Sequence, residues 1–194
     1  MRERLLEWMV CPLCGEGLEL EIFLQEGQEI VEGTLQCVCG QIFPIICGVP
    51  RILHGVLKKN LIQVYPEFFQ RYPELADEIF GFKRDSVIAQ KQKTIDRFGY
   101  EWTYFDDYNC DNFKTFISPL PINFLKGKLG LDIGCGAGRH ARQASEIGAE
   151  VVCVDLSEAV DIAYKNNAGN ELVHVVQSDI YKLPFKAGNF QFIY

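Results

Sequence analysis

Apolar and polar positions alternate regularly over the last third of the chain. From residue 128 onward, strand-like apolar runs are separated first by amphipathic stretches and then by a loop. The strand-like runs are LGLDIG, EVVCVDLS, LVHVVQSDI and NFQFIY, and the helix-like stretches are GRHARQASEIG and EAVDIAYKNNAG. Strands that alternate with helices favour a parallel sheet with crossover connections. We therefore predict an α/β fold in which residues 127–194 supply four strands of such a sheet.

The remainder of the chain divides into two zones with different patterns. Residues 1–55 are rich in cysteine, glycine and strand-like runs such as LELEIFL and LQCVCGQIFPII. Residues 56–126 carry helical patterns and most of the aromatic residues, and Pro119 and Pro121 mark the turn into the last zone. We predict a small β-rich domain over 1–55, a helical connecting region over 56–126, and the parallel sheet after it.

Composition narrows the class of protein. The chain has 194 residues, and a hydrophobic content of 48% is typical of a soluble globular protein. Its formal net charge of −7 argues against nucleic acid as a partner, because such surfaces show a basic excess. We expect no membrane span, and the charged N-terminus lacks the apolar core of a signal peptide. A cytoplasmic location is then expected, and the eight cysteines favour metal binding over disulfides.

Four of the cysteines form two tight pairs, C-P-L-C and C-V-C. Zinc binds four soft ligands in a tetrahedron, and a C-x2-C turn supplies two thiolates from one tight turn. Gly15 and Gly40 follow the two pairs and suit the positive φ of such turns. We predict a zinc ribbon whose structural zinc ion is held by Cys11, Cys14, Cys37 and Cys39.

Two alternatives stay open for these cysteines. The four could be buried structural residues without metal. The tighter C-x-C spacing also leaves open whether Cys47, eight residues further on, replaces one ligand. A catalytic zinc is disfavoured, because such a site keeps an open position and usually includes histidine or carboxylate ligands. A structural zinc would fold the ribbon, which is too small for a sufficient core of its own.

The string CPLCGEGLEL…LQCVCGQIFPIICGVPRIL resembles the N-terminal zinc ribbon of the Trm112-like family. The paired cysteines, the F-P-I after the second pair and the following G-V-P-R-I-L carry the resemblance. Members of that family occur as free methyltransferase activators and as domains fused in front of methyltransferases. The resemblance implies a structural or protein-contact role without catalysis, and it allows for a protein partner bound through the ribbon.

The segment LDIGCGAGRH at 131–140 places a glycine-rich turn between a strand-like run and a helix. Free N–H groups and the positive dipole end at a helix start favour an anionic group there. The glycines are spaced G-x-G-x-G, and Arg139 occupies the third glycine position of the dinucleotide pattern G-x-G-x-x-G. The turn also lacks the Lys-Ser/Thr of a P-loop. The spacing therefore disfavours dinucleotides and nucleotide hydrolysis.

With its surroundings, this turn resembles motif I of the class I S-adenosylmethionine-dependent methyltransferases, over residues 128 to 194. The resemblance implies a Rossmann-like sheet in which Asp132 fixes the turn and the methionine moiety, and Asp155 binds the ribose hydroxyls. It also implies that Asp179 accepts from the adenine amino group. The implied cofactor-binding residues are Asp132, Gly134, Cys135, Gly136, Gly138, Asp155, Leu156, Asp179 and Ile180.

The same resemblance implies transfer of a methyl group from S-adenosylmethionine to an acceptor, which we expect to be a small molecule. Methyl transfer is an in-line displacement that requires a general base only when the acceptor must lose a proton, so we assign no catalytic residue. In that family the acceptor-binding residues usually follow the fourth strand and lie in inserted or N-terminal segments, and here the fourth strand-like run is the last. We therefore expect this chain to be the N-terminal part of a larger methyltransferase.

Several of these features also have ordinary structural explanations. A glycine-rich turn is often only a tight turn, and Asp179 could equally cap a helix or turn. Cys135 has no evident histidine partner, so a small apolar filler is favoured over a nucleophile. The aromatic segment FGYEWTYFDDY at 98–108 could cover the cofactor, but core packing is favoured. The competing functions are a non-catalytic zinc-dependent interaction module and, more weakly, a dinucleotide-dependent oxidoreductase.

Overall fold

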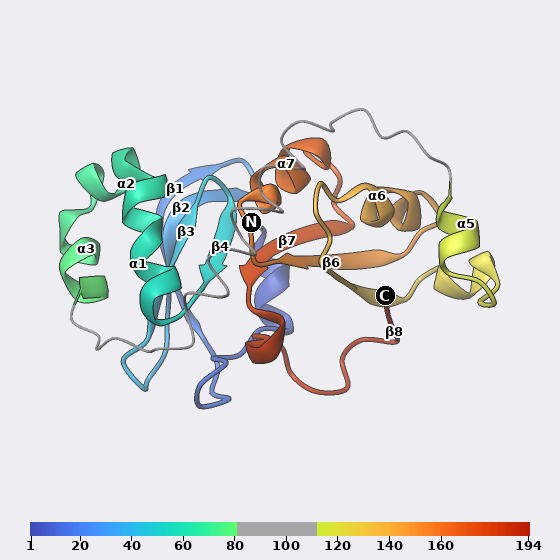
Figure 1. The fold of residues 1–194 in the computed structure, drawn as a ribbon, viewed down its shortest axis with the longest axis horizontal. Helices are drawn as coiled ribbons and strands as arrows, with labels where there is room; N and C mark the ends of the chain where they lie inside the picture. The colour runs from blue at the N-terminus through green and yellow to red at the C-terminus, as the bar shows by residue number, and fades with distance from the viewer. Residues whose placement is uncertain (81–111) are drawn as a thin grey trace.

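The computed structural model describes residues 1–80 and 112–194 of the chain. Within these ranges, eight strands form one mixed sheet in the order β1-β2-β3-β4-β7-β6-β5-β8 (Figure 1). The strands are β1 (Glu19–Glu26), β2 (Glu29–Gln36), β3 (Ile42–Ile46), β4 (Val49–Ile52), β5 (Leu129–Ile133), β6 (Glu150–Asp155), β7 (Val173–Ser178) and β8 (Phe192–Ile193). The helices are η1 (Glu3–Glu7), α1 (Gly55–Val64), α2 (Pro66–Arg71), α3 (Pro73–Phe80), α5 (Phe113–Phe116), η2 (Ile122–Leu125), α6 (Arg139–Glu146), α7 (Ala159–Asn166) and η3 (Ile180–Lys182).

The first four strands form antiparallel pairs, so the predicted β-rich zone is confirmed in its secondary structure. The β1–β2 hairpin turns at Gly27, whose φ of 61° suits glycine. The β3–β4 turn places Cys47 at a φ of 52° and Gly48 at 79°. A side chain at Gly48 would collide with the Tyr164 ring, so this turn can approach α7 closely.

The last four strands are parallel and lie in the order β7-β6-β5-β8, which confirms the predicted Rossmann-like arrangement of four strands. β5 and β6 are in register from the pair Leu129–Glu150 to the pair Ile133–Val154. The carboxyl ends of β5, β6 and β7 therefore meet at one edge of the sheet. In α/β sheets, this is the edge where ligands bind.

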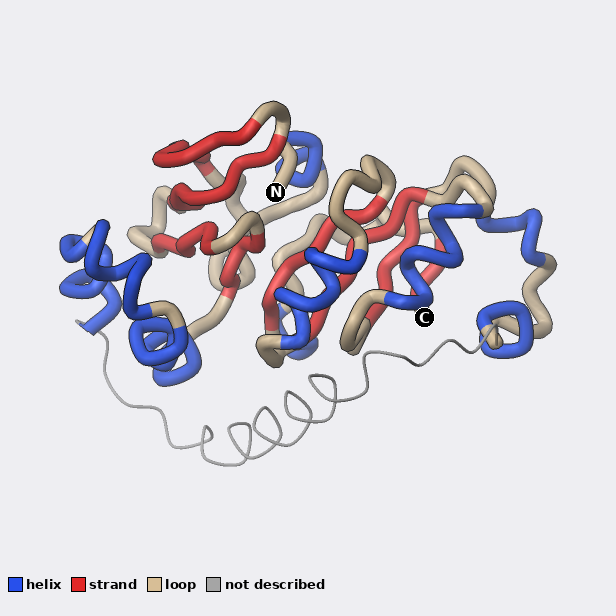
Figure 2. The backbone as a smooth tube through the Cα atoms, turned by 90° about the horizontal axis from the view of Figure 1, so that it is seen from above, coloured by secondary structure: helices blue, strands red, loops and turns tan. Residues whose placement is uncertain are grey.

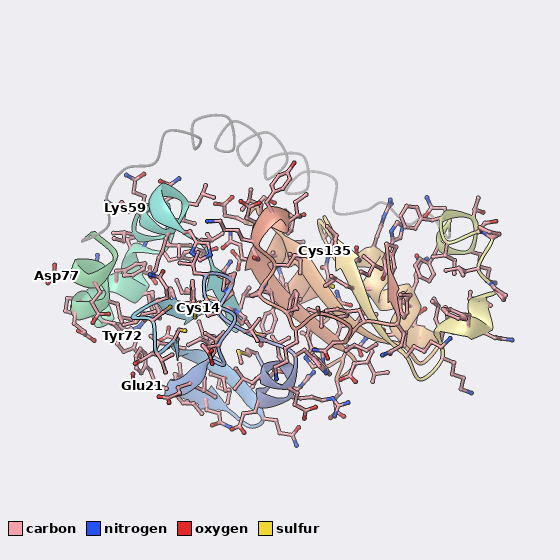
Figure 3. All side chains as sticks on the ribbon, turned by 90° about the horizontal axis from the view of Figure 1, so that it is seen from below. Cys14, Glu21, Lys59, Tyr72, Asp77 and Cys135 are labelled. Atoms are coloured by element: carbon pink, nitrogen blue, oxygen red, sulfur yellow. The ribbon has the colours of Figure 1, made fainter. Side chains whose placement is uncertain are left out.

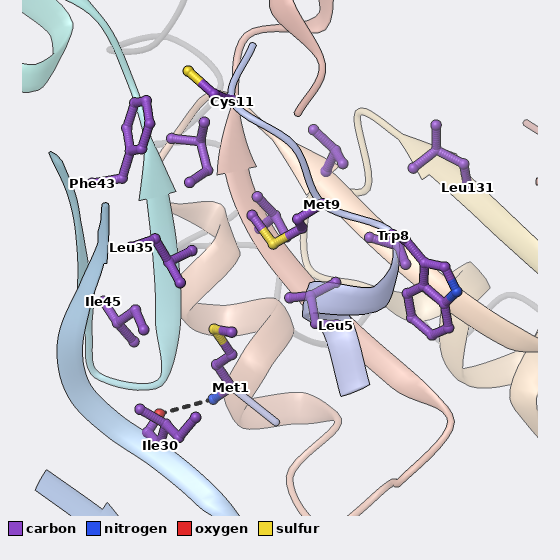
Figure 4. Close-up of a cluster of buried hydrophobic side chains, with 14 of the residues drawn as sticks. Met1, Leu5, Trp8, Met9, Cys11, Ile30, Leu35, Phe43, Ile45 and Leu131 are labelled. Carbon is purple, nitrogen blue, oxygen red and sulfur yellow. Dashed lines mark hydrogen bonds between the residues drawn. The ribbon is translucent and has the colours of Figure 1, made fainter. Parts of the chain in front are cut away.

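Residues of the central strand β6 point alternately to the two faces of the sheet. Val151 and Cys153 pack with buried residues of α6 and α7, which Figure 1 shows on the same face. Val152 and Val154 pack on the opposite face with side chains of the N-terminal segment. Figure 4 shows that segment beside the ribbon strands: Met1, Leu5, Trp8, Met9 and Cys11 lie between Ile30, Leu35, Phe43 and Ile45 on one side and Leu131 on the other.

The two halves of the sheet join through β4, which pairs in parallel with β7. The paired residues are Arg51 with Gln177 and Ile52 with Ser178. The sequence patterns predicted the parallel sheet within 127–194 and did not place a strand of the N-terminal zone in it. The strand order therefore makes the ribbon a continuation of the parallel sheet. Figure 2 shows the N-terminal strands beside the group of parallel strands.

The connecting region begins with three helices that pack against the ribbon and the edge of the parallel sheet. Leu53, Leu57 and Leu61 form one buried cluster with Phe68 and Phe69. The aromatic segment at 98–108 lies outside the described residues. None of the described helices combines the length and the hydropathy that a bilayer-spanning helix needs.

Candidate functional site

The glycine turn follows β5 and is held by the neighbouring strand. The backbone N–H groups of Gly134 and Cys135 both donate to the Val154 carbonyl, at 2.8 and 3.1 Å. Gly134, Gly136 and Gly138 have φ values of 75°, 51° and 75°, which other residues adopt only with strain. All three glycines therefore have a conformational reason to be glycine.

Asp155 ties the glycine turn to the end of β6. One carboxylate oxygen accepts from the Gly136 N–H at 3.0 Å, and the other accepts from the backbone N–H and the hydroxyl of Ser157, at 2.9 and 2.8 Å. These bonds hold the Asp155 carboxylate beside the turn at the ligand-binding edge. A carboxylate has further lone pairs, so it can also accept from the hydroxyls of a ligand.

Asp132 lies near the carboxyl end of β5 and is only 4% exposed. Its Oδ2 atom is buried and has no hydrogen-bond partner among the described residues. Burial and the nearby charge of Asp155 raise the pKa of Asp132 to about 7. A buried, unpaired carboxyl oxygen is costly unless a ligand supplies a donor or a positive charge.

Asp179 follows β7, so the structure places it at the same sheet edge as Asp132 and Asp155. Its carboxylate accepts from the Tyr181 N–H at 3.1 Å, so it caps the short helix η3. The capping role considered from the sequence is thus present. Ile180 is 48% exposed on η3, whereas Leu156 packs partly buried against the α1 cluster.

The glycines of the turn differ in what surrounds them. A Cβ atom on Gly134 would meet nothing within 4 Å, so the space beside this residue is open. A Cβ on Gly138 would lie 2.7 Å from the Asn167 amide nitrogen and 3.1 Å from the Ala163 Cβ. The Cys135 side chain is 8% exposed and packs in the core with Cys153, so it can face a ligand only through its backbone. Gly138 therefore permits helix packing, while Gly134 leaves room for a ligand.

The four predicted zinc ligands come together in the ribbon. Their sulfur atoms all lie within 4.8 Å of one another. The Sγ atoms of Cys11 and Cys39 are 3.7 Å apart, and those of Cys14 and Cys37 are 3.3 Å apart. In a tetrahedral zinc site with Zn–S bonds of about 2.3 Å, sulfur atoms lie roughly 3.8 Å apart.

The backbone around these cysteines also suits a metal site. Gly15 and Gly40 have φ values of 81° and 83°, and their N–H groups close the two turns on the carbonyls of Cys11 and Cys37, both at 2.8 Å. Cys47 lies outside the four-cysteine group. Figure 3 shows Cys14 in the ribbon, well away from Cys135 in the glycine turn. The residues present fit a structural metal ion that is separate from the ligand-binding edge.

Sequence reasoning missed three residues of this region: Arg51, Ser157 and Gln177. Gln177 is 2% exposed and donates to the Leu156 carbonyl at 3.0 Å. Arg51 is fully buried and donates to the Gln177 side chain at 3.1 Å. A single charged residue in the apolar run VPRIL was the available signal, because a buried charge must be paired.

Comparison with known proteins gives a family match over the last third of the chain. Residues 131–194 match a family model described as a methyltransferase domain. No curated protein matches the chain.

Several solved structures share part of the fold. The S-adenosylmethionine-dependent methyltransferase from Mesorhizobium loti is 27% identical over 44% of this chain and 39% of its own, with a TM-score of 0.38. The CcbJ methyltransferase from Streptomyces caelestis is 26% identical over 37% and 31%, with a TM-score of 0.34. A chain from the complex between the Haloferax volcanii Trm112 methyltransferase activator and the putative methyltransferase is 17% identical over 52% of this chain and 44% of its own, with a TM-score of 0.43. The chain spans less than half the length of each of these matched chains.

Proposed function

We propose that this chain belongs to an S-adenosylmethionine-dependent methyltransferase, on the premise that residues 131–194 are part of a methyltransferase domain. The observation that carries the proposal is the Asp155 carboxylate, which bonds the Gly136 N–H at 3.0 Å beside the open space at Gly134. The carboxylate, which can accept hydrogen bonds from the hydroxyl groups of a ligand, thus lies next to a turn that a ligand can approach closely. We propose a small-molecule acceptor for the methyl group.

In this proposal each acidic residue contacts a different part of the cofactor. Asp155 accepts from the ribose hydroxyls, and Asp179 accepts from the adenine amino group. Asp132 faces the positively charged methionine end of the cofactor. The buried Oδ2 atom of Asp132 has no hydrogen-bond partner among the described residues, and this positive charge would stabilise the ionised carboxylate. Leu156 and Ile180 supply apolar surface for the adenine, and the backbone of the turn at Gly134, Cys135, Gly136 and Gly138 passes close to the ligand.

The chemical contribution of these residues is binding and orientation. When bound, S-adenosylmethionine supplies an already activated methyl group, so the protein needs no nucleophile of its own. The glycine turn and the two strand-end carboxylates fix the cofactor relative to the sheet edge. Orientation and exclusion of water lower the barrier of a displacement reaction.

We further propose that the four ribbon cysteines hold a structural zinc ion. Four thiolates complete a tetrahedral shell and leave no open position for substrate, so the ion supplies folding energy and no catalysis. The ribbon resembles Trm112-like domains in its paired cysteines and its F-P-I and G-V-P-R-I-L segments. A cytoplasmic location follows from the expectation that these thiols stay reduced.

Calorimetric titration with S-adenosylhomocysteine tests the proposed cofactor site. We expect Asp155→Asn to weaken binding by at least about tenfold, because the amide offers one acceptor oxygen where the carboxylate offers two. Glu150→Gln is the matched control, since Glu150 begins the strand that Asp155 ends. Equal affinities for the unmodified protein and the Asp155→Asn variant would count against the site.

A non-catalytic interaction module remains the second candidate function. It is favoured by two exposed apolar side chains on the cysteine turns, Leu13 at 49% and Val38 at 81% exposure. This function predicts a stable protein complex in pull-down experiments, lost in a Leu13→Ser and Val38→Ser double variant, and no methyl transfer to any acceptor.

A further inference from the structure

A fully buried arginine joins the ribbon to the parallel sheet beside the proposed cofactor site. Arg51 lies in β4, opposite Gln177 of β7. Its guanidinium donates to the Gln177 side-chain oxygen and to the Ile46 carbonyl, both at 3.1 Å, and forms an ion pair with Asp161. The guanidinium also lies 4.6 Å from the centre of the Tyr65 ring.

The contacts of Arg51 lead to the turn between β6 and α7. Gln177 uses its oxygen for Arg51 and its nitrogen for the Leu156 carbonyl, at 3.0 Å. Leu156 follows Asp155, which holds the glycine turn. Asp161 lies in the first turn of α7 and also accepts from the Tyr65 hydroxyl at 2.6 Å.

Stability alone is a weak explanation for this arrangement. Removing an arginine from water is costly, and well-packed apolar residues often stabilise a fold as well as a buried ion pair does. The buried hydrogen bonds of the two terminal nitrogens of Arg51 do, however, fix one arrangement of the groups that they contact. Here the contacted groups are the Leu156 carbonyl, reached through Gln177 next to Asp155, and the Asp161 carboxylate at the start of α7.

We propose that Arg51 is a positioning residue of the cofactor site, acting through Gln177 on the Leu156 carbonyl and through Asp161 on the start of α7. This inference rests on the proposed function. It gives β4, the last strand of the ribbon, a role in cofactor binding. Arg51 exerts this role through its partners, and its described contacts include none of the proposed cofactor-binding side chains.

Gln177→Glu is the sharpest variant for testing this inference. The new carboxylate still accepts from Arg51, so the joint between β4 and β7 keeps its polar pair. Its second oxygen has no N–H to donate, so the bond to the Leu156 carbonyl is replaced by a contact between two acceptors. We expect the dissociation constant for S-adenosylhomocysteine to rise about tenfold, the size of one lost buried hydrogen bond, in a variant that stays folded with a melting temperature lower by roughly a few degrees.

Arg51→Met removes the whole network and should weaken S-adenosylhomocysteine binding at least as much. Arg4→Met is the matched control. Arg4 forms a bidentate ion pair with Glu150 at 2.6 and 2.7 Å, which joins the N-terminal segment to the opposite end of β6. We expect the Arg4→Met variant to bind S-adenosylhomocysteine with an affinity within about twofold of that of the unmodified protein.

The outcomes separate this inference from the proposed function. If the unmodified protein binds S-adenosylhomocysteine and the folded Gln177→Glu variant binds it equally well, Arg51 has no positioning role and the proposed function stands. If Arg51→Met does not fold, Gln177→Glu alone decides. Absence of binding by the unmodified protein would overturn both. Weaker binding by Arg4→Met as well would point to a general loss of stability and contradict the specific role.

Discussion

At the scale of single residues, the most informative group is the buried carboxyl of Asp132. In the folded protein its pKa is raised to about 7 by burial and by the charge of Asp155. The ordinary aspartate pKa is near 3.8. Between these two pH values the folded state binds more protons than the unfolded state, so this group makes folding less favourable as the pH rises.

We therefore predict that Asp132→Asn stabilises the protein at pH 8 by up to a few kcal/mol and has little effect near pH 4. The asparagine side chain is neutral at every pH and avoids the cost of a buried charge. Denaturant unfolding at a series of pH values measures the difference. A constant difference between variant and unmodified protein across this range would show that the Asp132 pKa is not raised.

Asp132→Asn should have the opposite effect on ligand binding. A cationic methionine end favours the ionised Asp132, so Asp132→Asn should weaken binding of S-adenosylmethionine while it stabilises the free protein. Removal of a favourable buried charge contact should cost about tenfold in affinity or more. Calorimetry at pH 8 measures this, and unchanged affinity would place Asp132 away from the ligand.

At the scale of elements, the glycine turn combines two kinds of glycine. Gly134 and Gly138 share a φ of 75°, so alanine at either position carries a similar backbone cost of about 1–2 kcal/mol. Only Gly138 also packs against α7, where a Cβ would lie 2.7 Å from the Asn167 amide. We predict that Gly138→Ala loses more stability, whereas Gly134→Ala loses more affinity for S-adenosylhomocysteine.

Thermal unfolding and calorimetry of the two alanine variants test this division. Each variant serves as the control for the other, because they differ by four positions in one turn. Equal losses of stability and equal losses of affinity would mean that the open space beside Gly134 has no part in binding.

The elements that could be predicted from the sequence are those specified by local patterns. The run EVVCVDLS has the apolar content of a buried strand, and it became β6 from Glu150 to Asp155. The paired cysteines and their following glycines likewise identified the four-cysteine group. Local spacing was enough in both cases.

Other parts of the site depend on contacts between distant segments. β4 contains Pro50 and Arg51, which are unfavourable in a central strand, and its pairing with β7 joins residues more than a hundred positions apart. Gln177 is an ordinary polar residue in the sequence, and only the fold places its side chain on the Leu156 carbonyl. Periodicity within one segment holds no information about such partners.

At the scale of the whole molecule, one continuous sheet makes the ribbon part of the methyltransferase-like fold. β4 covers the edge of β7, and the apolar residues of the N-terminal segment and ribbon share one core with β5, β6 and β7. Loss of the ribbon would expose both a strand edge and an apolar face. The stability of the parallel sheet should therefore depend on the four-cysteine group.

We predict one zinc ion per chain, lost in a Cys39→Ser variant and retained in Cys47→Ser. Structural zinc sites contribute about 10 kcal/mol or more to folding, so Cys39→Ser should lower the melting temperature of the whole protein and expose apolar surface to a fluorescent dye. Elemental analysis and circular dichroism provide the measurements. Equal zinc content in the two variants would remove Cys39 from the ligand set.

The central claim is that the glycine turn and the strand-end carboxylates form a site for S-adenosylmethionine. Parallel calorimetric titrations of the zinc-loaded protein with S-adenosylhomocysteine and with NAD⁺ test it most directly. The account predicts saturable binding of one S-adenosylhomocysteine per chain and no heat with NAD⁺, because Arg139 occupies the third glycine position of a dinucleotide site. No heat with S-adenosylhomocysteine, or equal binding of NAD⁺, would contradict it.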